Sequence, residues 1–194
     1  NLLTGGINNV NNSNIASGAA IAANKISGTA LTQSEIATDT QTNIGTSTAV
    51  VVTPANITSI LKRVYKSVNE TVNNNNTLQN DDTLLFSIGA NETWAFQLYM
   101  IWSSGATPDF QYKITIPTGG TMNYFDTFYF STFDETTVVI SVNGTGAKIG
   151  ESIRGVVING ATPGNVQLKW AQNTANLSDT IVYAGSYIIA HKLA

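Results

Sequence analysis

Few residues in this chain could carry acid–base or nucleophilic chemistry. The single histidine, His191, follows the apolar run Tyr187 to Ala190. A catalytic histidine needs a carboxylate to orient it, and this setting instead predicts an exposed position near the end of a strand. Cysteine is absent, which excludes disulfides, thiol nucleophiles and thiolate zinc sites. No Gly-x-Ser-x-Gly nucleophile elbow occurs either.

The remaining polar motifs are equally poor candidates for an active site. The glycine-rich run Gly144 to Gly150 departs in spacing from a dinucleotide fingerprint and predicts a turn. A pair of carboxylates is what a glycosidase requires, but the extended concave surface of a sugar cleft usually needs a longer chain. The carboxylates weighed are Asp81, Asp82, Glu92, Asp109, Asp126, Asp134, Glu135, Glu151 and Asp179. Calcium at Asp81–Asp82 or at Asp134–Glu135 would require an alternating carboxylate spacing that no loop has. We therefore expect no enzymatic activity, no cofactor and no metal.

Composition favours a protein that lies against other protein surfaces. Charged residues make up 11% of the 194 residues, against about 25% in average domains, so Asn, Thr, Ser and Gln must supply the polar surface. Few charges then have to be desolvated when copies of the chain pack together. The net charge of −3 and the lack of a basic run argue against nucleic acid, and no apolar run approaches the ~20 residues of a membrane span. The sequence starts at Asn1 without an initiator methionine, so we expect processing or a preceding segment.

Residues 1–52 predict an extended fibre shaft or anchor segment. The first 60 residues contain no aromatic side chain, on which the core of a monomeric domain usually depends. Aliphatic residues recur there every five or six positions, a period that fits neither a helix nor a strand. They include Ile15, Ile21, Ile26, Leu31 and Ile36. Three copies around an axis could meet at these positions, which makes them candidate trimer-interface residues; a flexible linker is the alternative.

An amphipathic helix is expected over residues 53–68. Thr53 is placed to cap it, and Pro54 occupies the first helical position, where its missing N–H is not needed. The apolar residues then repeat with helical spacing: Ile57, Ile60, Leu61, Val64, Tyr65 and Val68. Packing against the chain's own domain and a three-helix bundle on the fibre axis both fit this pattern. In the bundle, Ile57, Ile60, Leu61 and Val64 are the candidate trimer-interface residues.

After the asparagine run 73–76 the apolar period changes to two, and residues 69–194 predict a β-sandwich head domain. Turn signals separate eight strand candidates. These are residues 83–88, 94–102, 110–116, 121–131, 136–142, 150–159, 166–170 and 181–191. This spacing indicates an all-β, antiparallel, jelly-roll-like sandwich, with Trp94 and Trp102 in its core.

The stretch from Met122 to Phe133 is unusual because aromatic residues occur at both strand parities. Tyr124 takes one parity, and Phe125 and Tyr129 take the other. One face of this strand then belongs to the core, and the other to a trimer interface or a carbohydrate-stacking surface. Tyr124, Phe125 and Tyr129 are therefore candidate receptor-binding or interface residues.

Several stretches resemble bacteriophage virion proteins. The segment from Ser34 to Asn56 resembles one in phage tail fibres, with an acidic Thr-rich turn, a Gly-Thr-Ser-Thr stretch and a Val-Thr-Pro-Ala helix start in that order. Asn14 to Ile21 and Lys25 to Ala30 look like fibre-shaft sequence. The stretches Leu78 to Asp82 and Gly164 to Asn173 are similar to small phage virion proteins with a sandwich head.

The resemblance implies a virion location and trimeric assembly. The expected function is a structural one: a fibre or capsid-decoration protein anchored by its N-terminal segment and projecting the sandwich head. The expected partners are two further copies of the chain and other virion proteins of the capsid or tail. The alternative is an adhesin whose head recognises a host-surface glycan.

Overall fold

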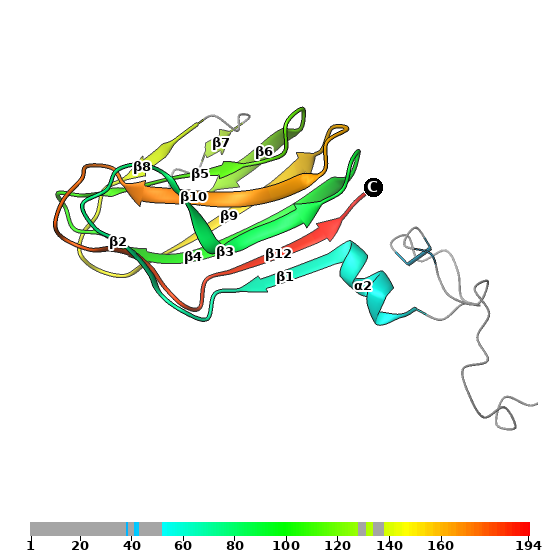
Figure 1. Cartoon of the computed structure of the whole chain (residues 1–194), viewed down its shortest axis with the longest axis horizontal. Helices are drawn as coiled ribbons and strands as arrows, with labels where there is room; N and C mark the ends of the chain where they lie inside the picture. Colours follow the sequence, from blue (N-terminus) through cyan, green and yellow to red (C-terminus); the bar gives the residue numbers. More distant parts are fainter. Residues whose placement is uncertain (1–37, 39–40, 43–51, 128–130, 134–137) are drawn as a thin grey trace, which may run out of the picture.

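The structure is a computed structural model that describes residues 38, 41–42, 52–127, 131–133 and 138–194 (Figure 1). The predicted shaft segment 1–52, with its candidate interface residues Ile15, Ile21, Ile26, Leu31 and Ile36, lies almost wholly outside the described residues.

Helix α2 (Pro54–Ile60) begins where its capping residues predict. The Thr53 hydroxyl accepts a hydrogen bond from the Asn56 N–H, and Asn56 Oδ1 accepts one from the Thr53 N–H at 2.9 Å. This reciprocal capping satisfies donors that the first helical turn leaves unpaired. The helix ends at Ile60 because Leu61 has extended backbone angles. The predicted helix over 53–68 is therefore wrong beyond Ile60.

Strand β1 (Leu61–Tyr65) replaces the second half of the predicted helix. It pairs antiparallel with β12 (Tyr187–Lys192), from Leu61 opposite His191 to Tyr65 opposite Tyr187. Pairing with β12 gives this segment backbone hydrogen bonds with a neighbouring strand, and alternation places Val64 against the core. The sandwich thus starts before the predicted boundary at residue 69, and Val64 faces its own domain and not a trimer axis.

The strands form two antiparallel sheets. The larger sheet has the order β1-β12-β4-β9-β6-β7, with β11 pairing both β4 and β2. Its further strands are β4 (Thr93–Ser103), β9 (Ile149–Ile158), β6 (Thr121–Asp126), β7 (Ser131–Phe133), β11 (Thr180–Val182) and β2 (Glu70–Val72). The smaller sheet has the order β3-β10-β5-β8. Its strands are β3 (Gln79–Ile88), β10 (Gly164–Gln172), β5 (Phe110–Thr115) and β8 (Ile140–Val142).

The two sheets face each other and enclose one core, as Figure 1 shows. Strand β4 alternates between buried and half-buried residues along most of its length, so one face is committed to the interior. Trp94 and Trp102 are buried there as predicted, and Trp102 stacks on Phe110 of the opposite sheet with ring centroids 4.5 Å apart. The antiparallel all-β sandwich is confirmed, while its jelly-roll-like connection stays a prediction.

The predicted strand 181–191 is divided in two. Gly185 has a φ of 95°, a backbone conformation that favours glycine, and it turns the chain between β11 and β12. At this turn the Gly185 N–H donates to the Lys66 carbonyl, and the Lys66 N–H donates to Ser186 O. The turn therefore holds the segment that follows β1 against the end of β12.

The two ends of the sandwich are different. Helix α2 and the C-terminal end of β12 lie at one end, together with the turns that join β3 to β4, β5 to β6 and β9 to β10 (Figure 1). Strand β2 and the loops beside it lie at the opposite end. Both ends of the sandwich therefore carry loops, and α2 distinguishes one of them.

Candidate functional site

The predicted interface residues of the helix do not form one stripe. Ile57 lies in α2 and is 38% exposed, whereas Leu61 and Val64 belong to strand β1. Ile60 and Leu61 are half-buried. Helix α2 has no buried residue at all. Ile57 is thus the member of the set with a clearly uncovered apolar side chain.

The aromatic residues of β6 separate by parity, as the alternation predicts. Tyr124 is buried in the core at 2% exposure, while Phe125 is 37% exposed on the outer side. Tyr124 as a receptor-binding or interface residue is therefore wrong, because its side chain fills the space between the sheets. Tyr129 lies outside the described residues.

A buried lysine joins the two sheets at one place. Lys66 is 1% exposed, and its Nζ lies 2.7 Å from Glu70 Oε2 and 3.0 Å from Asp81 Oδ2. Asp81 also accepts hydrogen bonds from the Leu84 N–H at 2.7 Å and from the Trp170 indole at 3.1 Å. A buried charge is tolerated only when it is paired and hydrogen-bonded, and every member of this lysine cluster has such partners.

The lysine cluster also determines what Asp81 can bind. Asp81, considered for calcium, is already occupied by the ammonium of Lys66. Burial raises the pKa of Glu70, against the opposing effect of its hydrogen bonds from Lys66 and the Asp82 N–H. The arrangement fixes strands and offers no open ligand position.

A pair of buried carboxyl groups joins the sheets at a second place. Asp126 of β6 is 0% exposed and Glu151 of β9 is 1% exposed. The Tyr112 hydroxyl, from the opposite sheet, makes hydrogen bonds to both: to Asp126 Oδ2, and to Glu151 Oε1 at 2.5 Å. The Trp102 indole donates to Glu151 Oε2 at 3.1 Å.

This carboxyl pair holds a proton. One hydroxyl supplies one proton, so the second short contact to Tyr112 requires a protonated carboxyl group. Burial, followed by the nearby charge and hydrogen bond of Asp126, raises the pKa of Glu151 to about 9. Burial of the Tyr124 hydroxyl, followed by the charge of Glu151, raises the pKa of Tyr124 to about 12. A pKa raised in this direction favours the protonated form of Glu151 at neutral pH.

The carboxyl pair is not arranged like a glycosidase. Its two acids would have to flank a substrate several ångströms apart in an open cleft. Here both groups are buried and share one tyrosine hydroxyl. A sugar could not reach either group in this conformation, so the contacts serve to join β5, β6 and β9.

The other candidates for chemistry are also without an active-site setting. His191 is exposed, and its cross-strand neighbours are Leu61 and Ala95, neither of which could orient it. Among the residues that the structure describes, no three His, Cys, Asp or Glu side chains gather as a metal site requires. Glu92 forms an ion pair with Lys192 at 2.9 Å. Asp134 and Glu135 lie outside the described residues.

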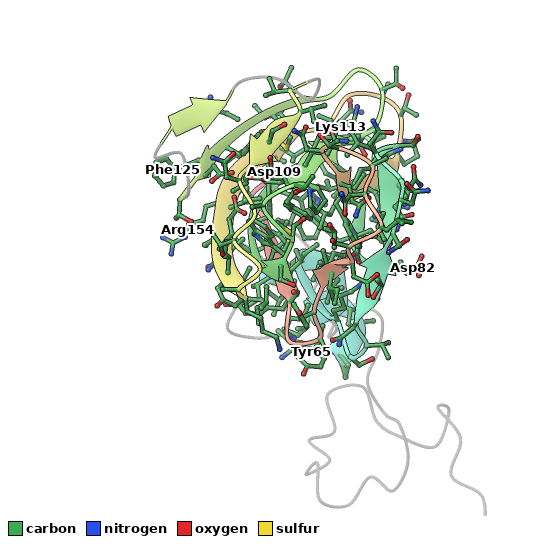
Figure 2. All side chains as sticks on the ribbon, turned by 90° about the vertical axis from the view of Figure 1, so that its left-hand side faces the viewer. Tyr65, Asp82, Asp109, Lys113, Phe125 and Arg154 are labelled. Carbon is green, nitrogen blue, oxygen red and sulfur yellow. The ribbon has the colours of Figure 1, made fainter. Side chains whose placement is uncertain are left out.

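A third feature is a tied loop at the end opposite α2. The Asn73 side chain donates to Leu177 O at 2.6 Å and to Asp179 Oδ1 at 2.9 Å. Gln172 holds the same loop through its side chain, which donates to Ser178 O at 2.6 Å. These bonds fix the loop backbone while the Leu177 side chain stays 79% exposed. Figure 2 views the molecule from this end.

The sequence carried a signal for one of the two buried clusters. Glu151 has the strand parity of Ile153 and Val157, and Asp126 has that of Met122 and Tyr124, so both carboxylates fall on core faces. Lys66 gave no such signal, because its burial depends on a turn made by residues distant in the chain.

No helix in the described part of the chain is both long and apolar enough to cross a bilayer.

Comparison with known proteins gives structural likenesses only. No protein-family model matches the chain, and neither does any curated protein sequence. The tripod from the baseplate of bacteriophage Tuc2009 aligns with a TM-score of 0.34 and 8% identity, over 93% of this chain and 84% of that chain.

Two structures from infectious bursal disease virus also align. The Gx strain structure gives a TM-score of 0.23 and 7% identity, over 68% of this chain and 40% of that chain. The subviral particle gives 0.21 and 9%, over 69% and 40%. Since every one of these TM-scores lies below 0.5, none of the likenesses establishes a shared fold or function.

Proposed function

We propose that this chain is a structural component of a bacteriophage particle, a trimeric fibre or capsid-decoration protein. Its N-terminal segment anchors it to other virion proteins, and the sandwich head projects outward. It has no enzymatic activity in this proposal. The resemblance of the N-terminal stretches to phage fibres supports the virion location.

Helix α2 is the observation that carries the assembly part of the proposal. A helix of seven residues is far shorter than the ~12–15 residues at which isolated helices become marginally stable. Such a helix needs packing on its apolar side, yet α2 buries no residue within the chain. Its position between the N-terminal segment and the head is where three copies around an axis would meet.

The head itself suits a passive structural role. Its interior polar groups are joined across the two sheets, by an ion pair at the lysine cluster and by hydrogen bonds at the carboxyl pair. These contacts stabilise the sandwich and leave no carboxylate pair facing a cleft among the residues described above. A rigid head with few surface charges is what a repeating particle component requires.

The test is the oligomeric state of the full chain. We expect sedimentation equilibrium to give a trimer at micromolar concentration. Ile57→Asp should shift it toward monomer, because a carboxylate would be desolvated at the axis. Ala55→Asp is the matched control, since Ala55 is exposed on the same helix and an acid in the first turn favours the helix. A monomeric wild-type chain, found singly on particles, would overturn the proposal.

The alternative function is a host-surface glycan adhesin, and the tied loop around Leu177 favours it. A receptor-binding loop benefits from being held in one conformation before binding, and this loop is fixed by side chains from Asn73 and Gln172. The full chain should then bind host cells, and Leu177→Asp should reduce that binding without changing the trimer. Absence of cell binding by the wild-type trimer would exclude this alternative.

A further inference from the structure

The outward surfaces of the two sheets differ in composition. On the smaller sheet the outward residues are mostly polar or charged. They include Asn80, Asp82, Ser87, Lys113, Ser141, Asn165 and Lys169. Asp82 and Lys113 are labelled on separate parts of this surface in Figure 2. Such a surface needs no protein partner.

The outward surface of the larger sheet, called here the outer face, is built differently. Strand register aligns its side chains in rows across β1, β12, β4, β9 and β6. The rows are Leu61, His191, Ala95, Val156 and Asn123; Arg63, Ile189, Gln97, Arg154 and Phe125; and Tyr65, Tyr187, Tyr99 and Ser152. These three rows contain no aspartate, no glutamate and no lysine.

Large side chains on the outer face are uncovered. Ile189 is 45% exposed and Tyr65 is 67% exposed. The Tyr99 and Tyr187 rings lie side by side, with centroids 5.5 Å apart. Aromatic residues and arginine are enriched at protein interfaces, whereas lysine, glutamate and aspartate are depleted there. The outer face therefore has the composition of an interface core.

The outer face also offers a projection and a hollow on opposite sides of β4: the projection is on β6, which β7 borders, and the hollow is at the outermost strand β1. Phe125 projects from β6, opposite Arg154. A hollow of about 270 Å³ lies at the β1–β12 edge and is lined by Arg63, Val64, Tyr65, Tyr187, Ile188 and Ile189. Figure 2 shows Phe125 and Tyr65 well apart on the surface. Two different patches that complement each other are what a ring of copies requires, because each copy contacts the next through unlike surfaces.

We propose that the outer face binds a second copy of this chain, with the Phe125 side of one head packing toward the hollow of the next. The inference rests on the proposed trimer and adds contact between heads to the contact at α2. Five strands about 4.8 Å apart, over about six residues of 3.3 Å, span roughly 500 Å² of flat sheet before side chains roughen it. That is of the order of the ~800 Å² per partner in a stable interface.

The test uses the absence of cysteine from the chain. Ile189→Cys places a single thiol on the outer face, and Val139→Cys places one beside β8 of the other sheet, where Val139 has a similar exposure of 42%. In the full-length trimer, maleimide should modify Cys at 139 at least tenfold faster than at 189. In denaturant the two rates should be equal.

Substitutions provide a second test of the proposed contact through the outer face. Phe125→Ala should raise the trimer dissociation constant at least tenfold, and Val139→Ala should leave it unchanged. Equal labelling rates in an intact trimer would overturn the outer face as the contact and leave the trimer standing. A monomer in which both thiols react freely would overturn both proposals. Protection of the thiol at 189 only after host polysaccharide is added would assign the outer face to a glycan instead.

Discussion

Replacing Glu151 by glutamine should remove a pH dependence from the stability of the head. The folded state holds the Glu151 pKa at about 9, against 4.5 for an ordinary glutamate. Between these values the folded protein keeps a proton that the unfolded chain has released. The free energy of unfolding therefore falls as pH rises, by about 1.4 kcal/mol per pH unit.

From pH 6 to pH 8 the fall attributable to Glu151 is about 3 kcal/mol. Glu151→Gln cannot ionise, and its amide can still donate a hydrogen bond to Tyr112, so the variant should lose this slope and be the more stable protein at pH 8. Urea unfolding at pH 6, 7 and 8, followed by tryptophan fluorescence, measures the slope directly. The buried indoles of Trp94, Trp102 and Trp170 make that signal sensitive to unfolding.

Glu92→Gln is the control of opposite sign. Although burial alone would raise the pKa of Glu92, its hydrogen bonds from Lys192, the Gly89 N–H and Trp94 together lower it. Its stabilising contribution is present above the ordinary pKa of 4.5 and is lost as pH falls through the lower folded value. The variant should leave the slope between pH 6 and 8 unchanged. Equal slopes for wild type and Glu151→Gln would refute the protonated pair.

Two further substitutions test a contact between the sheets and a tight turn. Lys66→Met leaves Glu70 and Asp81 without their cation and should lower the free energy of unfolding by about 3–5 kcal/mol. Lys113→Met, on the polar surface, should change it by less than about 0.5 kcal/mol. Similar losses for both variants in chemical denaturation would contradict the lysine cluster. Gly144→Ala places a Cβ 2.2 Å from the Gly105 carbonyl oxygen and should cost about 1–3 kcal/mol, measured as a lower thermal midpoint; an unchanged midpoint would show that the turn can shift freely.

The sandwich strands were predictable because one side of each is committed to the core. The alternation from Trp94 to Trp102 recurs as β4, and most of the glycine-rich run predicted as a turn, Gly144 to Gly150, lies between β8 and β9. The local sequence pattern predicted the wrong element where a helical period and a strand period fit the same residues. Leu61 and Val64 have helical spacing, but this segment is a strand because its backbone pairs with β12. The sequence near Leu61 cannot indicate a partner strand that lies more than a hundred residues away.

The buried clusters were less predictable than the strands. Asp126 lies in β6 and Glu151 in β9, and the sequence alone does not show that these two strands pair. Tyr112 reaches them from the other sheet, so only the packing of the sheets creates the pair. Aromatic residues at both parities of β6 make either face a candidate for binding, and only the packing of the sheets shows that Tyr124 lies on the core face.

The position of β1 has a consequence for how the head is made. It is the first strand of the sandwich, and its partner in the larger sheet is β12, which follows every other strand in sequence. During synthesis β1 must therefore wait, with its backbone groups unpaired, until β12 has emerged. Pairings of such long sequence separation form slowly, since the intervening loop entropy is lost first. The segment that links the head to the proposed anchor is thus among the last to be fixed, so the proposed assembly through α2 should follow completion of the head.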